Sequence, residues 1–273
     1  MQLGSTMSLP DFFAVHPVFT REELVRHLTE TGGGEPNAST VRALLRYHQT
    51  TGRILSVRRG LYATVAPGSS PSTAPVDAYL VGALGCPGGV LAYHAALELH
   101  GLAYSTFEEV QILVPRHQRG WSFRGVEYRP VKPRESLGDA ALTLGVETMD
   151  RQGINLRVTS VTRTLVDVLD RPDLSGGWEE VWRSLETLKV VDDAEALAYL
   201  ERLGNATTSA LVGFYLERHP GVLEAAGETL TKMESLRPKG RQYLDRKAGG
   251  RLAARWNLIV PESLWQRSWE EMP

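Results

Sequence analysis

Two hydrophobic patterns with helical spacing follow one another near the start of the chain. Thr20 and Glu23 form a capping-box pattern, so a helix is expected to begin directly after Thr20 and to cover residues 21–31. A second helix is expected to begin after Asn37 or Ser39 and to stop before Gly52. The residues that define the two apolar faces are Leu24 and Leu28 in the first helix, and Val41, Leu44, Leu45 and His48 in the second.

Beyond Gly52 the hydrophobic period changes from that of a helix to that of a strand. Apolar residues alternate with polar ones on both sides of Arg58, Arg59 and Gly60. Because Gly60 can adopt the positive φ of a tight turn, this segment is expected to be a β-hairpin with a basic tip. Two helices followed by such a hairpin are typical of a winged helix-turn-helix, so we predict that residues 1–66 form a DNA-binding domain of this type.

The rest of the chain predicts a linker and a larger second domain. Residues 67–75 are rich in Pro, Ser and Gly and have no apolar period, which favours a linker. Residues 76–273 mix helical and strand-like patterns and end in a helix-rich part, so we predict an α/β fold of the α+β type. The expected helices are 76–84, 90–100, 161–169, 178–189, 194–203, 207–218 and 222–236, and the expected strands are 110–114, 121–128, 144–148 and 154–158.

Composition places the chain among ordinary globular proteins, since 42% of its 273 residues are hydrophobic and 23% are charged. Its one cysteine, Cys86, has no partner for an internal disulfide, and no apolar run approaches the roughly 18 residues that cross a bilayer. The first ten residues lack the charged and apolar parts of a signal peptide, and Met7 is a candidate for the native start. We therefore expect a cytoplasmic protein without membrane contact.

Charge is unevenly distributed along the chain, although the net charge is only −2. Residues 37–66 contain five arginines and no acidic residue, whereas acids outnumber bases over residues 173–234. Residues 237–255 are basic again, with Asp245 as their acid. A local excess of positive charge favours contact with phosphate groups.

The second predicted helix and the hairpin carry the candidate DNA-binding residues. An α-helix fits the major groove, where Arg42 could bond guanine bidentately, and each such pair gives about 1 to 3 kcal/mol of discrimination. If the domain neutralises about four phosphates, the log–log salt slope is about −3.6 per protomer, so a dimer or array would be needed for tight binding. The candidates are Ser39, Thr40, Arg42, Ala43, Arg46, Tyr47 and Gln49 on the helix, and Arg53, Arg58, Arg59 and Gly60 on the hairpin.

A polar helix face is often only a solvated surface. Here the DNA-binding interpretation is favoured because capped helices, an acid-free interval and a basic glycine hairpin follow one another within a short segment. For residues 237–255 a structural or interdomain role is favoured, because Leu252, Trp256 and other apolar residues interrupt the basic ones. The alternative is a secondary DNA or partner contact made by Arg237, Lys239, Arg241, Arg246, Lys247 and Arg251.

No catalytic, metal-binding or cofactor-binding signature is present in the sequence, so neither a metal nor a cofactor is expected. The alternative function is a nucleic-acid-modifying enzyme whose winged domain delivers a catalytic domain. It would require His94, Asp139, Asp150 or Asp167 to converge on a metal. A further alternative is a module in which the basic C-terminal stretch docks on an acidic protein surface.

Four stretches of the sequence resemble proteins of the AbiEi family. They are "RRGLYA" at 58–63, "LAYHAALELHGL" at 91–102, "RVTSVTRTLVDVLDRP" at 157–172 and "ARWNLIVP" at 254–261. These family proteins are antitoxins and transcriptional autorepressors of type IV toxin–antitoxin systems.

The resemblance implies a winged helix that binds double-stranded DNA at inverted repeats in the protein's own promoter. It also implies a C-terminal α/β domain that is needed for antitoxicity and for cooperative self-association on DNA. A nucleotidyltransferase-like toxin is the implied partner, and the antitoxin would counteract it either by direct binding or without a stable complex. The positions that match the DNA-reading helix are 39–49, and those that match the wing are 53–65.

Overall fold

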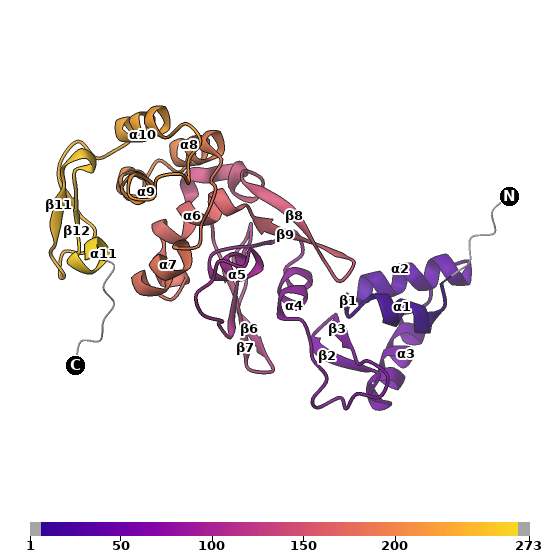
Figure 1. The fold of residues 1–273 in the computed structure, drawn as a ribbon. Helices are drawn as coiled ribbons and strands as arrows, with labels where there is room; N and C mark the ends of the chain where they lie inside the picture. Colours follow the sequence, from indigo (N-terminus) through magenta and orange to yellow (C-terminus); the bar gives the residue numbers. More distant parts are fainter. Residues whose placement is uncertain (1–6, 267–273) are drawn as a thin grey trace.

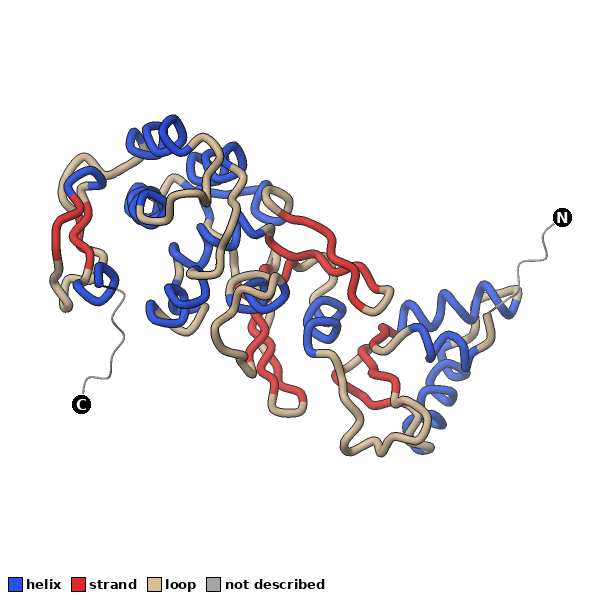
Figure 2. Tube along the Cα trace, in the orientation of Figure 1, coloured by secondary structure: helices blue, strands red, loops and turns tan. Residues whose placement is uncertain are grey.

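The structure is a computed structural model that describes residues 7–266. An N-terminal unit of three helices and a small sheet lies at one end of the molecule, and a second small sheet lies at the opposite end (Figure 1). Between them lie a larger mixed sheet and a group of helices (Figure 2). The fold is of the α+β class, as predicted, and residues 1–6 of the predicted first domain lie outside the described part.

The N-terminal unit consists of residues 8–66. Its sheet is antiparallel with strand order β1-β3-β2, and Val18 pairs with Ala63 across the first two strands. The side chains of Phe12, Phe19, Leu24 and other residues form its own apolar core. Its elements are α1 (Leu9–Val15), β1 (Val18–Thr20), α2 (Arg21–Gly32), α3 (Ala38–Thr50), β2 (Ile54–Arg58) and β3 (Leu61–Thr64).

The helix ends in this unit follow local capping chemistry. The Thr20 hydroxyl accepts the Glu23 N–H at 3.2 Å, and the Glu23 carboxylate accepts the Thr20 N–H at 2.7 Å, which confirms the predicted capping box of α2. Helix α1 was not predicted. It begins with a similar box, in which Ser8 and Asp11 satisfy each other's backbone N–H groups.

The second unit is built on a six-stranded mixed sheet with strand order β6-β7-β5-β4-β9-β8. Strands β5 and β7 are parallel, as are β4 and β9, and the other neighbouring pairs are antiparallel. Its elements are α4 (Ala78–Gly85), β4 (Val90–Leu91), α5 (His94–Leu99), β5 (Glu109–Leu113), β6 (Trp121–Phe123), β7 (Val126–Val131), η1 (Glu135–Leu142), β8 (Val146–Arg151) and β9 (Ile154–Thr159).

A helical group follows the sheet, and a three-stranded sheet of order β10-β12-β11 covers its far end. Trp256 of this small sheet region is fully buried and packs against Gly213, where an added Cβ would lie 2.2 Å from the indole. The elements are α6 (Val161–Asp170), η2 (Pro172–Leu174), α7 (Trp178–Leu185), α8 (Asp193–Leu203), α9 (Ala206–Glu217), α10 (Ala226–Ser235), β10 (Gln242–Tyr243), β11 (Arg251–Ala253), η3 (Ala254–Trp256), β12 (Leu258–Val260) and α11 (Glu262–Gln266).

Besides α1, three stretches form elements of another kind than the sequence-based expectation, and the expected helices 178–189 and 222–236 are shorter, at Trp178–Leu185 and Ala226–Ser235. Residues 90–100 were expected to be one helix, but Val90–Leu91 is a strand that lies between β5 and β9. Tyr93 has a φ of 56°, which is not helical, so α5 begins only after it. Residues 121–128 were expected to be one strand, but Arg124 and Gly125 take positive φ and form the turn of a β6–β7 hairpin. The small C-terminal sheet was not predicted, because its strands are only two or three residues long.

The expected linker is held against both units. Arg124 donates hydrogen bonds to the carbonyl oxygens of Pro71 and Ala74. Asp77, which caps α4, accepts a hydrogen bond from Arg151 Nε at 2.6 Å. The two units also share one apolar cluster, in which Val18, Val57, Leu61 and Ala63 of the first unit join Leu80, Val81 and Cys86 of the second. The N-terminal unit is therefore docked on α4 rather than tethered by a free spacer.

No helix within residues 7–266 combines the length and apolar character that a membrane span needs.

Candidate nucleic-acid interface

Helix α3 buries one face and exposes the other. Val41, Leu45 and His48 are buried against the N-terminal core. All seven candidate residues on the helix are exposed, and Tyr47 exposes 62% of its surface. The exposed face carries Arg42 and Arg46 one turn apart and no carboxylate. The structure thus brings the helix candidates together on one open, positively charged surface.

The start of α3 is organised by Asn37, one of the two expected N-caps. Its side-chain oxygen accepts the Thr40 N–H at 2.8 Å, and it also accepts the hydroxyl groups of Ser39 at 2.6 Å and Thr40 at 3.0 Å. Both residues are exposed, and a hydroxyl oxygen that donates a hydrogen bond can still accept others. The partial positive charge of a helix N-terminus also favours nearby phosphate.

His48 anchors α3 from the buried side. Its ring makes an edge contact with Phe13 at a centroid distance of 5.0 Å. Burial lowers the pKa of His48, and the positive charge of Arg53 lowers it further. The side chain is therefore neutral near pH 7 and adds no charge to the α3 surface.

The β2–β3 hairpin divides its candidate residues between two environments. Arg59 is exposed at the turn, and Gly60 has φ 82°, as predicted for a tight turn. The Gly60 carbonyl oxygen accepts the Arg21 N–H at 2.8 Å, which ties the turn to the start of α2. Arg53 is exposed at the other end of β2. Arg58 instead lies over the ring of Trp121, with its Cζ 4.3 Å from the ring centroid.

Sequence reasoning missed two features, which are the contact of Trp121 with this hairpin and the basic loop that precedes Trp121. Trp121 was assigned only to a strand, and no local signal indicates that it contacts Arg58. Arg116, His117 and Arg119 are exposed in the loop that leads to Trp121. These three residues lie within four positions, and that spacing was a signal that could have identified the loop as a further candidate for contact with DNA.

The basic C-terminal segment has mixed roles. Arg237 pairs with Glu234 and donates a hydrogen bond to the Arg255 carbonyl oxygen, and Arg251 lies over the Trp265 ring at 4.6 Å. These contacts agree with a structural role for part of the segment. The remaining candidates Lys239, Arg241, Arg246 and Lys247 are exposed. They lie at the end of the molecule opposite α3 (Figure 1), so the two basic surfaces are not adjacent.

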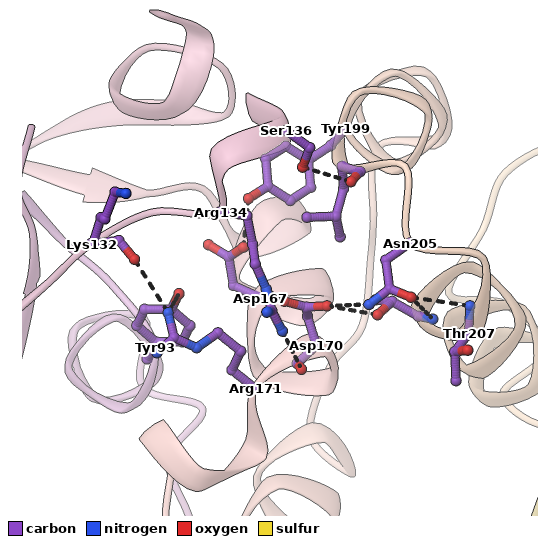
Figure 3. A network of polar contacts seen from close by, with 12 residues as sticks. Tyr93, Lys132, Arg134, Ser136, Asp167, Asp170, Arg171, Tyr199, Asn205 and Thr207 are labelled. Atoms are coloured by element: carbon purple, nitrogen blue, oxygen red, sulfur yellow. Dashed lines mark hydrogen bonds and ion pairs between the residues drawn. The ribbon is translucent and has the colours of Figure 1, made fainter. Parts of the chain in front are cut away.

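Asp167, named for the enzyme alternative, is part of a buried network (Figure 3). It accepts a hydrogen bond from the Tyr199 hydroxyl at 2.5 Å and pairs with Arg163 at 3.1 Å. Burial raises the pKa of the Asp167 carboxyl, while the Arg163 charge opposes that shift. Nearby, Asp170 pairs with Arg134 at 2.6 Å and accepts a hydrogen bond from Asn205 at 2.9 Å.

His94 lies in a different network. It is fully buried, its Nε2 lies 3.1 Å from a Glu180 oxygen, and its ring stacks on Phe107. Burial would raise the pKa of Glu180, but hydrogen bonds from Ser105 and His94 outweigh that effect and lower it. Within residues 7–266 no group of three or more His, Cys, Asp or Glu side chains is arranged to hold a metal. His94 and Asp167 therefore lie in separate networks with different partners.

Comparison with known proteins gives a likeness of fold. No protein-family model matches the chain, and no curated protein sequence matches it. Among solved structures, the RV2827C protein from Mycobacterium tuberculosis is similar, with a TM-score of 0.56 and 17% sequence identity. The match covers 92% of this chain and 89% of that chain. The chain therefore shares an overall fold, across both units, with that mycobacterial protein.

Proposed function

We propose that the protein is a sequence-specific DNA-binding autorepressor and antitoxin of a type IV toxin–antitoxin system. In this proposal the N-terminal unit is a winged helix, α3 enters the major groove, and the β2–β3 hairpin is the wing that lies against the DNA backbone. The observation that carries the proposal is the exposed face of α3, which presents Arg42, Arg46, Tyr47 and Gln49 without a carboxylate.

The arrangement around α3 supports this assignment physically. The helix is fixed from behind by Val41, Leu45 and His48, so its exposed side chains are presented from a rigid element. Arg42 and Arg46 supply charge for phosphates or guanine edges, and Ala43 is small enough for the helix backbone to approach the groove. An ordinary solvated helix face usually interleaves acids with bases, and this face does not.

The regulatory role rests on the resemblance to AbiEi-family proteins. It suggests inverted repeats in the protein's own promoter as the operator, with cooperative self-association on that DNA. It also suggests a nucleotidyltransferase-like toxin as a partner, which this protein would counteract by direct binding or without a stable complex. Both proteins would act in the cytoplasm. The second unit would then supply antitoxicity and contacts between protomers.

The proposal is tested by fluorescence-anisotropy titration of the full-length protein with the duplex upstream of its own gene and with a scrambled duplex. Wild type should prefer the upstream duplex at least about tenfold, which corresponds to about 1.4 kcal/mol. Arg42→Ala should reduce that preference about fivefold or more, since a bidentate base contact is lost. Lys232→Ala, an exposed change on α10 at the far end, should bind like wild type. Equal affinity of wild type for both duplexes would overturn the proposal.

A further inference from the structure

Arg58 is held by the second unit. Its Cζ lies 4.3 Å from the centroid of the Trp121 ring, and its Nη1 donates a hydrogen bond to the Gly85 carbonyl oxygen at 3.4 Å. Trp121 is itself stacked on the buried ring of Tyr128, with 4.9 Å between centroids. The guanidinium therefore rests on an aromatic face whose position is fixed from behind.

The backbone of β2 directs Arg58 toward this face. The pairing register between β2 and β3 shifts between Ser56 and Arg58, which marks a β-bulge. Val57, between those two residues, is buried in the apolar cluster that the two units share, and so is Leu61 on the other side of the turn. The hairpin is thus docked on the second unit through both strands, with Arg58 as the charged contact.

Arg59 has a different environment although it is the next residue. Its side chain is exposed. Within the described part of the chain, no hydrogen bond, ion pair or ring contact involves its guanidinium, whereas Arg58 has both a hydrogen-bond and a ring partner. Of the two arginines at the turn, Arg59 is therefore the one whose guanidinium can contact a phosphate without breaking an existing contact.

We propose that Trp121 is a positioning residue for DNA binding: it fixes the hairpin through Arg58, while Arg59 makes the hairpin's phosphate contact. This inference rests on the proposed function. It assigns different roles to Arg58 and Arg59, which the sequence alone groups together as DNA-binding candidates. Loss of the Arg58–Trp121 contact then weakens DNA binding by loosening the hairpin, without removing an ion pair to DNA.

The salt dependence of binding separates these roles. Each phosphate contact contributes about −0.9 to the slope of log affinity against log salt concentration. Arg59→Ala should make the slope shallower by about that amount. Arg58→Ala and Trp121→Leu should each lower affinity by about twofold to thirtyfold, the range of a cation–π contact, and should leave the slope unchanged.

The experiment measures the affinity of full-length wild type and of each variant for one duplex of arbitrary sequence at several salt concentrations. Trp121→Phe keeps an aromatic face for Arg58 and should retain most of the wild-type affinity. The double variant Arg58→Ala with Trp121→Leu should bind DNA no more weakly than whichever single variant has the lower affinity. The reason is that each single variant and the double variant lose the same Arg58–Trp121 contact. Arg58 is partly exposed, so Arg58→Ala removes no core side chain. Its slope of log affinity against log salt concentration decides whether Arg58 contacts a phosphate, even if Trp121→Leu folds poorly.

Four outcomes would count against the inference, and the last of them would also overturn the proposed function. A shallower slope for Arg58→Ala would make Arg58 a phosphate ligand and overturn the division of roles. Wild-type affinity for Trp121→Leu, or additive losses in the double variant, would overturn the positioning role of Trp121. A wild-type protein that binds no DNA at any salt concentration would overturn the proposed function and this inference together.

Discussion

Gly85 and Trp121 approach each other so closely that a Cβ on Gly85 would lie 2.6 Å from Cζ2 of the indole. Leu61 of the β2–β3 hairpin is the next neighbour of that position, with its Cδ2 at 3.5 Å. The last residue of α4 is therefore a point where both units meet without space for a side chain. The approach of Leu61 to this position, together with the shared apolar cluster, joins the N-terminal unit to the second unit.

We expect Gly85→Ala to lower the free energy of unfolding by about 1 to 3 kcal/mol, because the added methyl group must displace Trp121. Urea denaturation of wild type and variant measures the difference. Gly227→Ala is the matched control, since Gly227 lies in α10 with nothing within 4 Å of an added Cβ, and its stability should be unchanged or slightly higher. Wild-type stability of Gly85→Ala would show that the contact is not tight.

Acidification is expected to destabilise the folded protein through His48 of the N-terminal unit. Burial and the Arg53 charge lower the pKa of His48 in the folded protein, while the unfolded chain keeps a value of about 6.5. The unfolded state therefore binds more protons as the pH falls below that value, and stability should decrease between about pH 7 and pH 5.

His48→Gln should show a smaller decrease over this range, as measured by urea denaturation at both pH values. His117 is exposed, so His117→Gln should retain the wild-type pH dependence and serves as the control. If His48→Gln lost as much stability on acidification as wild type, the proposed protonation of His48 on unfolding would be wrong.

The third prediction concerns the buried pair Arg163 and Asp167. Removing one partner leaves an uncompensated charge in the interior, so Asp167→Ala should cost about 3 to 5 kcal/mol of unfolding free energy. Replacing both, as Arg163→Met with Asp167→Leu, should cost less than Asp167→Ala alone. Thermal and urea unfolding of the three proteins provide the comparison. A double variant less stable than the single one would mean that the pair stabilises the fold outright.

Several local features of the fold could be predicted because their causes lie within a few residues. Thr20 and Ser160 cap the helices that follow them, and Gly60 takes the positive φ that its turn requires. The capped helix 161–169 was predicted within one residue of α6. These features depend on neighbouring side chains and on backbone sterics, both of which the local sequence specifies.

Other features depend on partners distant in the chain. Val90 and Leu91 form a strand because β5 and β9 flank them, although the local pattern resembles the helix that follows. Arg58 was interpreted from its neighbours Arg59 and Gly60, but its environment is set by Trp121 and Gly85 of the second unit. The apolar period and the charge pattern could predict which face of α3 is exposed. They could not predict which arginine of the hairpin contacts the second unit.

Site-directed cross-linking tests most directly whether the exposed face of α3 lies in the major groove. Ala43→Cys places a thiol on that face, while the native Cys86 is buried and burial raises its pKa to about 11, so it should stay unreactive. A duplex from the upstream region that carries a thiol-reactive group on a major-groove base edge should cross-link to Ala43→Cys and not to Lys232→Cys. No cross-link at position 43 at saturating DNA, or equal cross-linking at both positions, would contradict the account.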